Sequence, residues 1–333
     1  MRCPPTGVSL LVVLLGSAPA HAQNRLGEID FFGYKGLDVE KIRKALPVKE
    51  GDEYLDRMKG RVRAAVVAAI GVEPTDISSK CCDTNGNRLL YIGLPGASYK
   101  SFTFNAAPTG TERLPAEIID LRKRVDDAEK AAVYRGAAGE DDSKGYALSN
   151  DPTARALELE LREWAIHHER ELLRALEFAA AVQDRRVAAS AVGYIRQSPE
   201  QINALVHASR DPDATVRDLA TRAVWVLAES NTQLAAAIPA DTFIDMLNSG
   251  TWTDRNKGIL LLDDLTKQRD AKLLAKIRSA ALDSLIEMAS WHWTGHAASA
   301  RIVLGRIAGI PEERLSDLAF QGSAGSIIEA VGR

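Results

Sequence analysis

The chain has 333 residues, of which 46% are hydrophobic and 26% charged, and its formal net charge is -3. This composition excludes a disordered tail or a fibre and is enough for two folded domains. The near-neutral charge argues against a dedicated nucleic-acid-binding protein, because such proteins neutralise phosphates with clustered Lys and Arg. Aromatic residues make up only 6% while alanines recur in clusters, so we expect a mostly α-helical protein.

Residues 1–22 have the pattern of a secretory signal peptide. Arg2 precedes an apolar run from Val8 to Leu15, and Ala20-His21-Ala22 is the small-x-small pattern that signal peptidase cuts. We therefore predict cleavage after Ala22 and a periplasmic or secreted protein. The apolar run is far shorter than the ~20 residues that span a bilayer, and no later segment stays apolar that long, so we expect no transmembrane anchor.

Cleavage would leave two cysteines, the adjacent pair Cys81 and Cys82, in an oxidising compartment. Neighbouring side chains on a strand point to opposite faces, so a bond between these two requires a distorted turn, whereas separate thiols require none. Free buried thiols are therefore our first interpretation, and a local or intermolecular disulfide is the second. A redox or metal site is the third, because no further ligands lie nearby in the sequence.

Residues 23–110 are expected to form a small α/β domain in the order β-α-α-β-β. The expected elements are a strand over 27–34, helices over 39–46 and 58–70, and strands over 77–83 and 88–94. Asp38 is positioned to cap the first helix, and Gly71 to end the second. Asn85-Gly86 predicts a hairpin between the last two strands. A further β-prone run, Lys100 to Asn105, is interpreted as an added edge strand.

The segment GYKGLDVEKIRKALPVKEGDEY at 33–54 resembles a POTRA domain, the polypeptide-transport-associated module of outer-membrane assembly and secretion proteins. The matching positions are Gly36, Ile42, Leu46, Gly51 and Asp52. This resemblance implies that a partner binds by adding a strand to the sheet edge. It brings no catalytic residues.

Helical patterns dominate from residue 111 onwards. Residues 111–152 are interpreted as a helical lead-in with a solvated loop at 136–150. Residues 153–333 contain a loose repeat, in which Ala191, Ala223, Leu261 and Val303 are equivalent positions 32, 38 and 42 residues apart. The predicted repeat helices are 184–195, 216–227, 254–265 and 296–307, preceded by partner helices at 169–181, 199–209, 239–247 and 271–290.

The best of these units, DPDATVR at 211–217, resembles a HEAT repeat. In that family an Asp and an Arg form a polar ladder between repeats, and the resemblance assigns this role to Asp213 and Arg217. It implies a HEAT-like α-solenoid of paired helices with an extended binding surface. Asp254-Arg255 keeps an acid and a base in a different frame, and the unit at 296–307 keeps only the small residues.

The sequence offers little catalytic chemistry. His292 and His296 are four residues apart, as two metal ligands on one helix face require, but Gly295 interrupts them and no glutamate follows either one. We interpret this segment as a loop whose tryptophans cover the core. His167 and His168 are interpreted as surface residues at a helix start. Nucleophile-elbow, phosphate-loop and C-x-x-C patterns do not occur, so we expect no catalytic residue, cofactor or metal.

Three functional hypotheses follow. The first is a non-enzymatic exported scaffold that binds a protein or peptide partner on the solenoid surface. The second is an envelope assembly or secretion factor that acts through the edge of the POTRA-like sheet. The third is a metal-dependent hydrolase that uses His292 and His296. The sequence identifies neither the partner, the partner-binding residues nor the oligomeric state.

Overall fold

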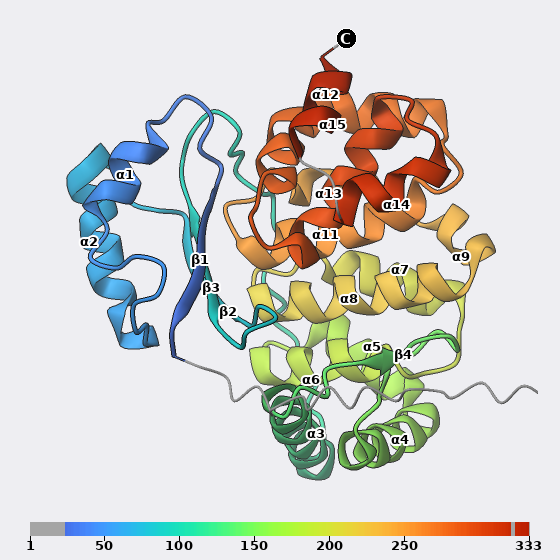
Figure 1. The fold of residues 1–333 in the computed structure, drawn as a ribbon. Helices are drawn as coiled ribbons and strands as arrows, with labels where there is room; N and C mark the ends of the chain where they lie inside the picture. Colours follow the sequence, from blue (N-terminus) through green and yellow to red (C-terminus); the bar gives the residue numbers. More distant parts are fainter. Residues whose placement is uncertain (1–23, 321–323, 333) are drawn as a thin grey trace, which may run out of the picture.

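The computed structural model describes residues 24–320 and 324–332, and within these ranges the chain is mostly helical with a small mixed sheet of three strands (Figure 1). The sheet and two helices lie on one side of a larger group of helices. The predicted signal peptide lies outside the described residues. Within those ranges, no helix combines the length and apolar character needed to cross a bilayer.

The N-terminal α/β region (residues 24–94) has the predicted order of elements. These are β1 (Leu26–Phe32), α1 (Val39–Ala45), the short 3-10 helix η1 (Asp56–Met58), α2 (Lys59–Ile70), β2 (Asp76–Cys81) and β3 (Arg88–Gly93). Asp38 accepts a hydrogen bond from the backbone N–H of Lys41 and so caps α1. Gly71 ends α2 with a φ of 77°, which glycine adopts without steric cost.

The sheet has β3 at its centre, parallel to β1 and antiparallel to β2. Because successive side chains of a strand point to opposite faces, the sheet contributes to two cores. Leu90 and Ile92 of β3 pack in the core formed with α1 and α2. Leu89 and Tyr91 belong to the larger core that continues into the helices. The sheet is therefore buried on both faces.

The rest of the described chain contains helices, one short hairpin and an irregular segment before the first of these helices. Its elements are α3 (Ala116–Tyr134), β4 (Glu140–Asp141), β5 (Leu148–Ser149), α4 (Pro152–His167), α5 (Glu169–Phe178), α6 (Val182–Val192), α7 (Pro199–Ala208), α8 (Ala214–Ser230), α9 (Thr232–Ala237), α10 (Asp241–Met246), α11 (Trp252–Leu265), α12 (Ala271–Ala289), α13 (Thr294–Ile307), α14 (Glu312–Phe320) and α15 (Ala324–Val331). All four predicted repeat helices and their four partner helices are present. They pack as the pairs α5–α6, α7–α8, α10–α11 and α12–α13.

The second helices of these pairs, α6, α8, α11 and α13, also pack against one another in succession. Small residues allow this close approach: a side chain at Gly193, just after α6, would lie 3.1 Å from the Cβ of Ala223 in α8. The four second helices therefore share one continuous hydrophobic core.

The predicted edge strand at 100–105 is wrong. Residues 98–114, which we call the strap, contain no strand there and run across the ends of successive first helices. The backbone N–H groups of Lys100, Asn105 and Gly110 donate to the carbonyl oxygens of Asn248, Arg210 and Phe178, at 2.9, 2.7 and 2.8 Å. The carbonyls of Asn248 and Arg210 lie just after α10 and α7, and the carbonyl of Phe178 belongs to the last residue of α5. The strap therefore bonds to free carbonyl groups at helix ends instead of to a neighbouring strand.

The interpretation of 136–150 as a solvated loop is also wrong in part. This segment, which we call the hairpin, contains the two-residue strands β4 and β5. Its second half is buried, including Ala147, Leu148 and Ser149. The apolar residues that follow the acidic run decide this outcome, because they pack against the helical core.

Candidate functional site

The two predicted ladder residues both connect neighbouring helix pairs, but they do not bond to each other. The carboxylate of Asp213 caps α8 and pairs with Arg186 of α6, with N–O distances of 2.7 and 2.9 Å. The guanidinium of Arg217 pairs in a bidentate manner with Asp254 of α11, at 2.9 and 3.0 Å. The Arg217–Asp254 pair is fully buried, whereas Arg186 is partly exposed.

Two further buried ion pairs extend this ladder and were missed by the sequence analysis. Arg185 pairs with Asp211, and Arg255 pairs with Glu287 at 3.3 Å. The arginines of the three buried pairs are each the fourth residue of α6, α8 or α11, and they are 32 and 38 residues apart. The repeat positions Ala191, Ala223 and Leu261 are separated by the same two steps, so the recurrence of arginine in register with the repeat was a usable signal.

Glu287 of α12 also holds the α/β region against the helices. Its carboxylate accepts hydrogen bonds from the backbone N–H groups of Gly33, Tyr34 and Lys35 at 2.7, 2.9 and 3.0 Å. The hydroxyl of Ser98 donates to the same carboxylate at 2.5 Å. One buried acid thus joins the end of β1, the start of the strap and Arg255, which fixes the two regions relative to each other.

The ladder is not an open binding surface, because the strap covers it. The side chain of Phe102 is buried, and the ring of Phe104 lies 4.5 Å from the guanidinium carbon of Arg217. Arg210 stacks on Phe102 at 5.0 Å and donates to the carbonyl oxygen of Thr103. The chain itself therefore occupies this edge of the paired helices.

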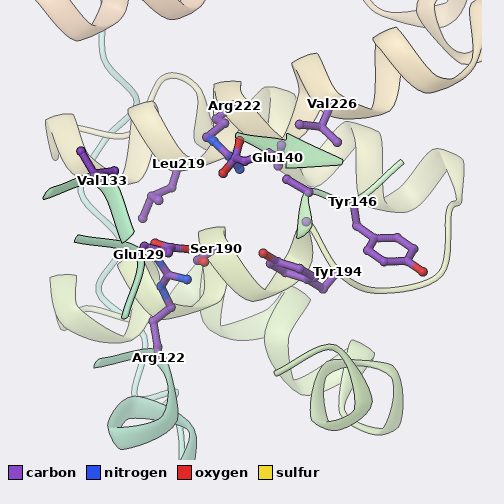
Figure 2. A pocket seen from close by; sticks show the side chains of 13 residues that line it. Arg122, Glu129, Val133, Glu140, Tyr146, Ser190, Tyr194, Leu219, Arg222 and Val226 are labelled. Carbon is purple, nitrogen blue, oxygen red and sulfur yellow. Dashed lines mark hydrogen bonds and ion pairs between the residues drawn. The ribbon is translucent and has the colours of Figure 1, made fainter. Parts of the chain in front are cut away.

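A cavity of about 240 Å³ lies between α3, α6, α8 and the hairpin (Figure 2). It is lined by Arg122, Glu129 and Val133 of α3, by Glu140, Tyr146 and Ala147 of the hairpin, by Ser190, Gly193 and Tyr194 at the end of α6, and by Leu219, Arg222, Ala223 and Val226 of α8. Sequence reasoning did not find this site, because its walls come from four separated segments of the chain.

The cavity has cationic and anionic groups in close contact. Arg222 forms an ion pair with Glu140 of β4, and Arg122 forms ion pairs with Asp126 at 2.5 Å and Glu129 at 3.1 Å. Burial is the largest single effect and lowers the pKa of the Arg222 guanidinium, but the charges of Glu140, Tyr194 and Glu129 and the hydrogen bond to Glu140 together raise this pKa overall. Both arginines are therefore charged anchors for carboxylates.

A buried carboxyl group lies directly behind the cavity wall. Glu158 of α4 is 1% exposed and accepts a hydrogen bond from the backbone N–H of Ser149 at 2.6 Å. Burial raises its pKa to about 7, and the nearby charges of Glu129 and Glu140 act in the same direction. The hairpin is thus attached to α4 through an acid that titrates near neutral pH.

His292 and His296 do not form a shared site. His292 lies in the loop before α13 and bonds to Asp30 at 2.7 Å, whereas His296 lies in the first turn of α13 and bonds to the Tyr91 hydroxyl at 2.6 Å. The interpretation of the whole segment as a loop is therefore wrong from Thr294 onwards. Among residues 24–320 and 324–332, no group of three or more His, Cys, Asp or Glu side chains is arranged to hold a metal ion.

The two histidines have opposite pKa shifts. The hydrogen bond to Asp30 raises the pKa of His292. Burial lowers the pKa of His296 to about 4, and the positive charges of Lys257 and Lys80 contribute. His296 belongs to an aromatic cluster with Tyr91, Trp252 and Trp291, in which ring centroids are 4.9 to 6.4 Å apart. Trp291 is buried, as predicted for a tryptophan that covers the core.

The other predicted surface histidines connect two helices. His167 is the last residue of α4, and His168 stands between α4 and α5. The ring of His168 stacks on Trp164 with a centroid distance of 4.0 Å. The prediction of a helix start at this point is confirmed.

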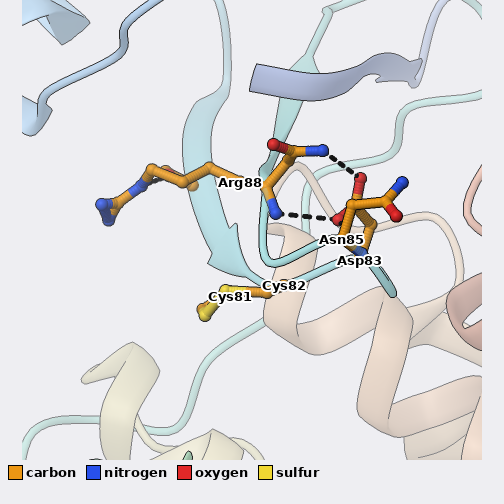
Figure 3. The surroundings of a disulfide bond; sticks show 7 residues. Cys81, Cys82, Asp83, Asn85 and Arg88 are labelled. Atoms are coloured by element: carbon orange, nitrogen blue, oxygen red, sulfur yellow. Dashed lines mark hydrogen bonds between the residues drawn. A yellow bond between two sulfur atoms is a disulfide. The ribbon is translucent and has the colours of Figure 1, made fainter. Parts of the chain in front are cut away.

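Cys81 and Cys82 are joined by a disulfide bond (Figure 3). The first interpretation, free buried thiols, is wrong: the bond is local, and Cys81 is exposed. The strand β2 ends at Cys81, so the alternation of side chains along a strand does not extend to Cys82. In the turn that follows, the carboxylate of Asp83 accepts hydrogen bonds from the backbone N–H groups of Asn85 and Asn87.

Comparison with known proteins adds no family: no family model matches the chain, and no curated protein matches it significantly. The function must therefore be inferred from the geometry described above.

Proposed function

We propose that the chain is a non-enzymatic exported scaffold, a HEAT-like α-solenoid preceded by a POTRA-like domain, which binds a protein or peptide partner at the cavity between α3, α6 and α8. The observation that carries this proposal is the Arg222–Glu140 ion pair. Here the chain's own extended segment β4 places an acidic side chain against α8, in the position that an acidic segment of a partner would take.

The chemistry of the cavity suits such a partner. A guanidinium in a partly buried site makes charge-assisted hydrogen bonds to a carboxylate, which are stronger than neutral ones. Val133 and Tyr134, at the end of α3 beside the cavity, are 39% and 56% exposed. Exposed apolar and aromatic side chains next to a charged pocket are typical of peptide-binding surfaces. The partner segment is thus an extended peptide that carries an acidic residue close to an apolar one.

Co-purification from an envelope extract tests this function. Tagged mature protein is compared with Arg222→Gln, and the recovered proteins are quantified by mass spectrometry. The matched control is Arg174→Gln, because Arg174 forms an exposed ion pair with Glu112 outside the cavity. We expect a set of proteins to be lost with Arg222→Gln and retained with Arg174→Gln. Equal recovery with both folded variants would contradict binding at the cavity.

The unpaired edge of β2 favours a second candidate function, in which a partner binds by adding a strand to the sheet. Within the part of the chain that the structure describes, no strand pairs with the outer edge of β2. The other edge strand, β1, is partly covered, because Arg43 and Trp291 donate hydrogen bonds to the carbonyl oxygens of Ile29 and Phe31. An unpaired edge is the surface to which an extended segment adds.

Proline substitutions in β2 test the second candidate. In an edge strand, every second N–H group points away from the sheet. One of the two variants Ser78→Pro and Ser79→Pro therefore removes a donor that points away from the sheet and leaves the hydrogen bonds within the sheet intact. If the protein assists envelope assembly through this edge, the variant that folds will lower the levels of outer-membrane proteins in cells. Unchanged levels with that variant would exclude strand addition as the function.

A further inference from the structure

We propose that the hydroxyl groups of Ser190 and Tyr194 form the buried half of a carboxylate-binding site, of which Arg222 is the more exposed half. The ligand is a carboxylate of the partner, either the side chain of an acidic residue or a free C-terminus. This inference rests on the proposed function, because it concerns the same cavity. It adds two residues that determine which ligand the cavity accepts, and it explains how a partner displaces Glu140.

The two hydroxyl groups lie in the wall of the cavity (Figure 2). Ser190 of α6 is 9% exposed, and Tyr194, four residues further along the chain, is 6% exposed. In the part of the chain that the structure describes, no side chain or backbone group forms a hydrogen bond with either hydroxyl, and neither oxygen is sealed off by protein atoms. Because buried hydroxyls normally have a partner, this pair indicates a ligand that supplies one.

The cavity has more hydrogen-bond donors than its own acceptors use. Its two carboxylates are already paired, Glu140 with Arg222 and Glu129 with Arg122. The Tyr194 hydroxyl stays protonated at neutral pH, since burial raises its pKa further above the usual range. It is therefore a donor, as a serine hydroxyl also is. A carboxylate has about four acceptor positions, so one such group complements both hydroxyls and a guanidinium.

The charge of the cavity favours the same ligand. Two arginines and two glutamates line it, so their charges cancel. The exchange of Glu140 for a carboxylate of the partner preserves this balance. A neutral ligand in place of Glu140 would leave Arg222 without its counter-charge, and a phosphate would bring additional negative charge next to Glu129.

Glu140 can leave Arg222 while the hairpin stays in place. Its side chain is 37% exposed at the ion pair, whereas Ala147 and Leu148 in the second half of the hairpin are buried. A rotation of the Glu140 side chain into solvent is therefore sufficient to expose Arg222. A carboxylate of the partner then bonds to Arg222 and to the two hydroxyls, which Glu140 does not use. These additional hydrogen bonds offset the advantage that Glu140 has as part of the same chain.

The Tyr194 hydroxyl is held in position before any ligand binds. The ring of Tyr194 belongs to the main hydrophobic core and packs against Tyr146 of the hairpin, with a centroid distance of 6.3 Å. The guanidinium carbon of Arg162 in α4 lies 4.2 Å from the ring centre of Tyr146 and covers it. A side chain that is already ordered loses little conformational entropy on binding, so its hydrogen bond contributes more to affinity.

Binding of short peptides to the full mature protein tests this site. The probes are acetyl-Leu-Glu-Ala-amide, its neutral analogue with Gln in place of Glu, and acetyl-Leu-Ala-Ala with a free C-terminus, each titrated by NMR. We expect at least one acidic probe to bind roughly tenfold or more tightly than the neutral one, because charged acceptors make the stronger hydrogen bonds. The two acidic probes distinguish a side-chain carboxylate from a C-terminal one. Failure of both to bind would overturn the proposal.

Single variants of the cavity should change the affinity in opposite directions. Tyr194→Phe and Ser190→Ala each remove one hydroxyl and should weaken binding of the acidic probe by roughly tenfold. Glu140→Gln removes the internal competitor and should strengthen it. Tyr99→Phe is the matched control, since Tyr99 lies in the strap outside the cavity, and it should bind like the wild type. Unchanged affinity in both folded hydroxyl variants would overturn the proposal and show that these hydroxyls bind only water.

The two proposals can fail separately. A partner that is lost with Arg222→Gln but retained by both Tyr194→Phe and Ser190→Ala would refute the hydroxyl site and leave partner binding at the cavity. Equal co-purification with Arg222→Gln and Arg174→Gln, combined with the expected affinities for the acidic probes, would refute the partner function and leave the carboxylate site.

Discussion

The strap and the hairpin are both irregular segments that lie on the same second helices, yet the charges that hold them differ in kind. The strap (residues 98–114) covers arginine–carboxylate pairs, such as Arg217–Asp254, in which opposite charges compensate each other. The hairpin (residues 136–150) lies beside a buried acid, Glu158, which accepts a hydrogen bond from the backbone N–H of Ser149 and has Glu129 and Glu140 as like-charged neighbours.

The two segments therefore cover charges of different kinds. In the ladder beneath the strap, each buried guanidinium lies beside a carboxylate of opposite charge. Burial raises the pKa of Glu158 beside the hairpin to about 7, so this acid changes its charge near neutral pH.

The largest expected effect comes from breaking the buried ladder. Arg217→Ala leaves Asp254 buried without its partner, and the free energy of unfolding should fall by about 3–5 kcal/mol. Arg186→Ala removes a partly exposed pair with Asp213 and should cost at most about 1 kcal/mol. Chemical denaturation measures both variants. Similar losses would show that the buried ladder has no special role.

A comparison of its two phenylalanines tests how the strap is attached to the helices. Phe102→Ala removes a side chain that is 7% exposed and should lower the free energy of unfolding by about 3 kcal/mol. Phe104 is 46% exposed, so Phe104→Ala loses mainly its contact with Arg217, worth about 0.5–1 kcal/mol. Limited proteolysis should cut the strap faster in the first variant only. Equal cleavage in both would argue against Phe102 as the anchor.

A smaller effect is expected in the pKa values of His292 and His296. In an NMR titration, the pKa of His292 should lie above the ordinary 6.5, and that of His296 at about 4. Because folding lowers the pKa of His296, its contribution to stability is present above pH 6.5 and is lost as the pH falls towards 4. Asp30→Asn should lower the pKa of His292 and leave that of His296 unchanged. A joint shift of both histidines would indicate a shared site after all.

The smallest expected effect concerns the disulfide. A cross-link between adjacent residues closes the shortest loop, and the entropy that a disulfide removes from the unfolded chain grows with loop length. Replacing Cys81 and Cys82 together by serine should therefore change the free energy of unfolding by less than about 1 kcal/mol. Alkylation without reductant, followed by mass spectrometry, should find both cysteines unmodified in the wild-type protein. Labelled thiols there would contradict the bond.

Local signals were sufficient to predict most of the elements. Asp38 and Gly71 bound α1 and α2 because capping and a positive φ depend on neighbouring residues alone. The repeat of small and apolar residues predicted the four second helices, because each of these helices packs against the next one. The run Lys100 to Asn105 was misassigned, since its β-propensity is real but its hydrogen-bond partners are helix ends far along the chain.

The candidate site shows where sequence reasoning stops. Glu140 was part of an acidic run that predicts solvated surface, and nothing near it in the chain indicates Arg222 as its partner, 82 residues away. The same holds for Glu158, whose raised pKa depends on burial and on acids from α3 and β4. The ionisation of a buried group and the lining of a cavity both depend on distances between separate segments, and these distances are set only when the chain folds.

The sequence by itself determined the mostly helical class, the order of elements in the α/β region and the pairing of the helices, because each follows from periodicity and short-range bonding. Only the tertiary structure decided that the strap covers the ladder, that Cys81 and Cys82 form a local disulfide, and that the hairpin closes a charged cavity. The physical reason is that burial and long-range charge contacts are properties of packed surfaces, to which residues distant in the chain contribute together.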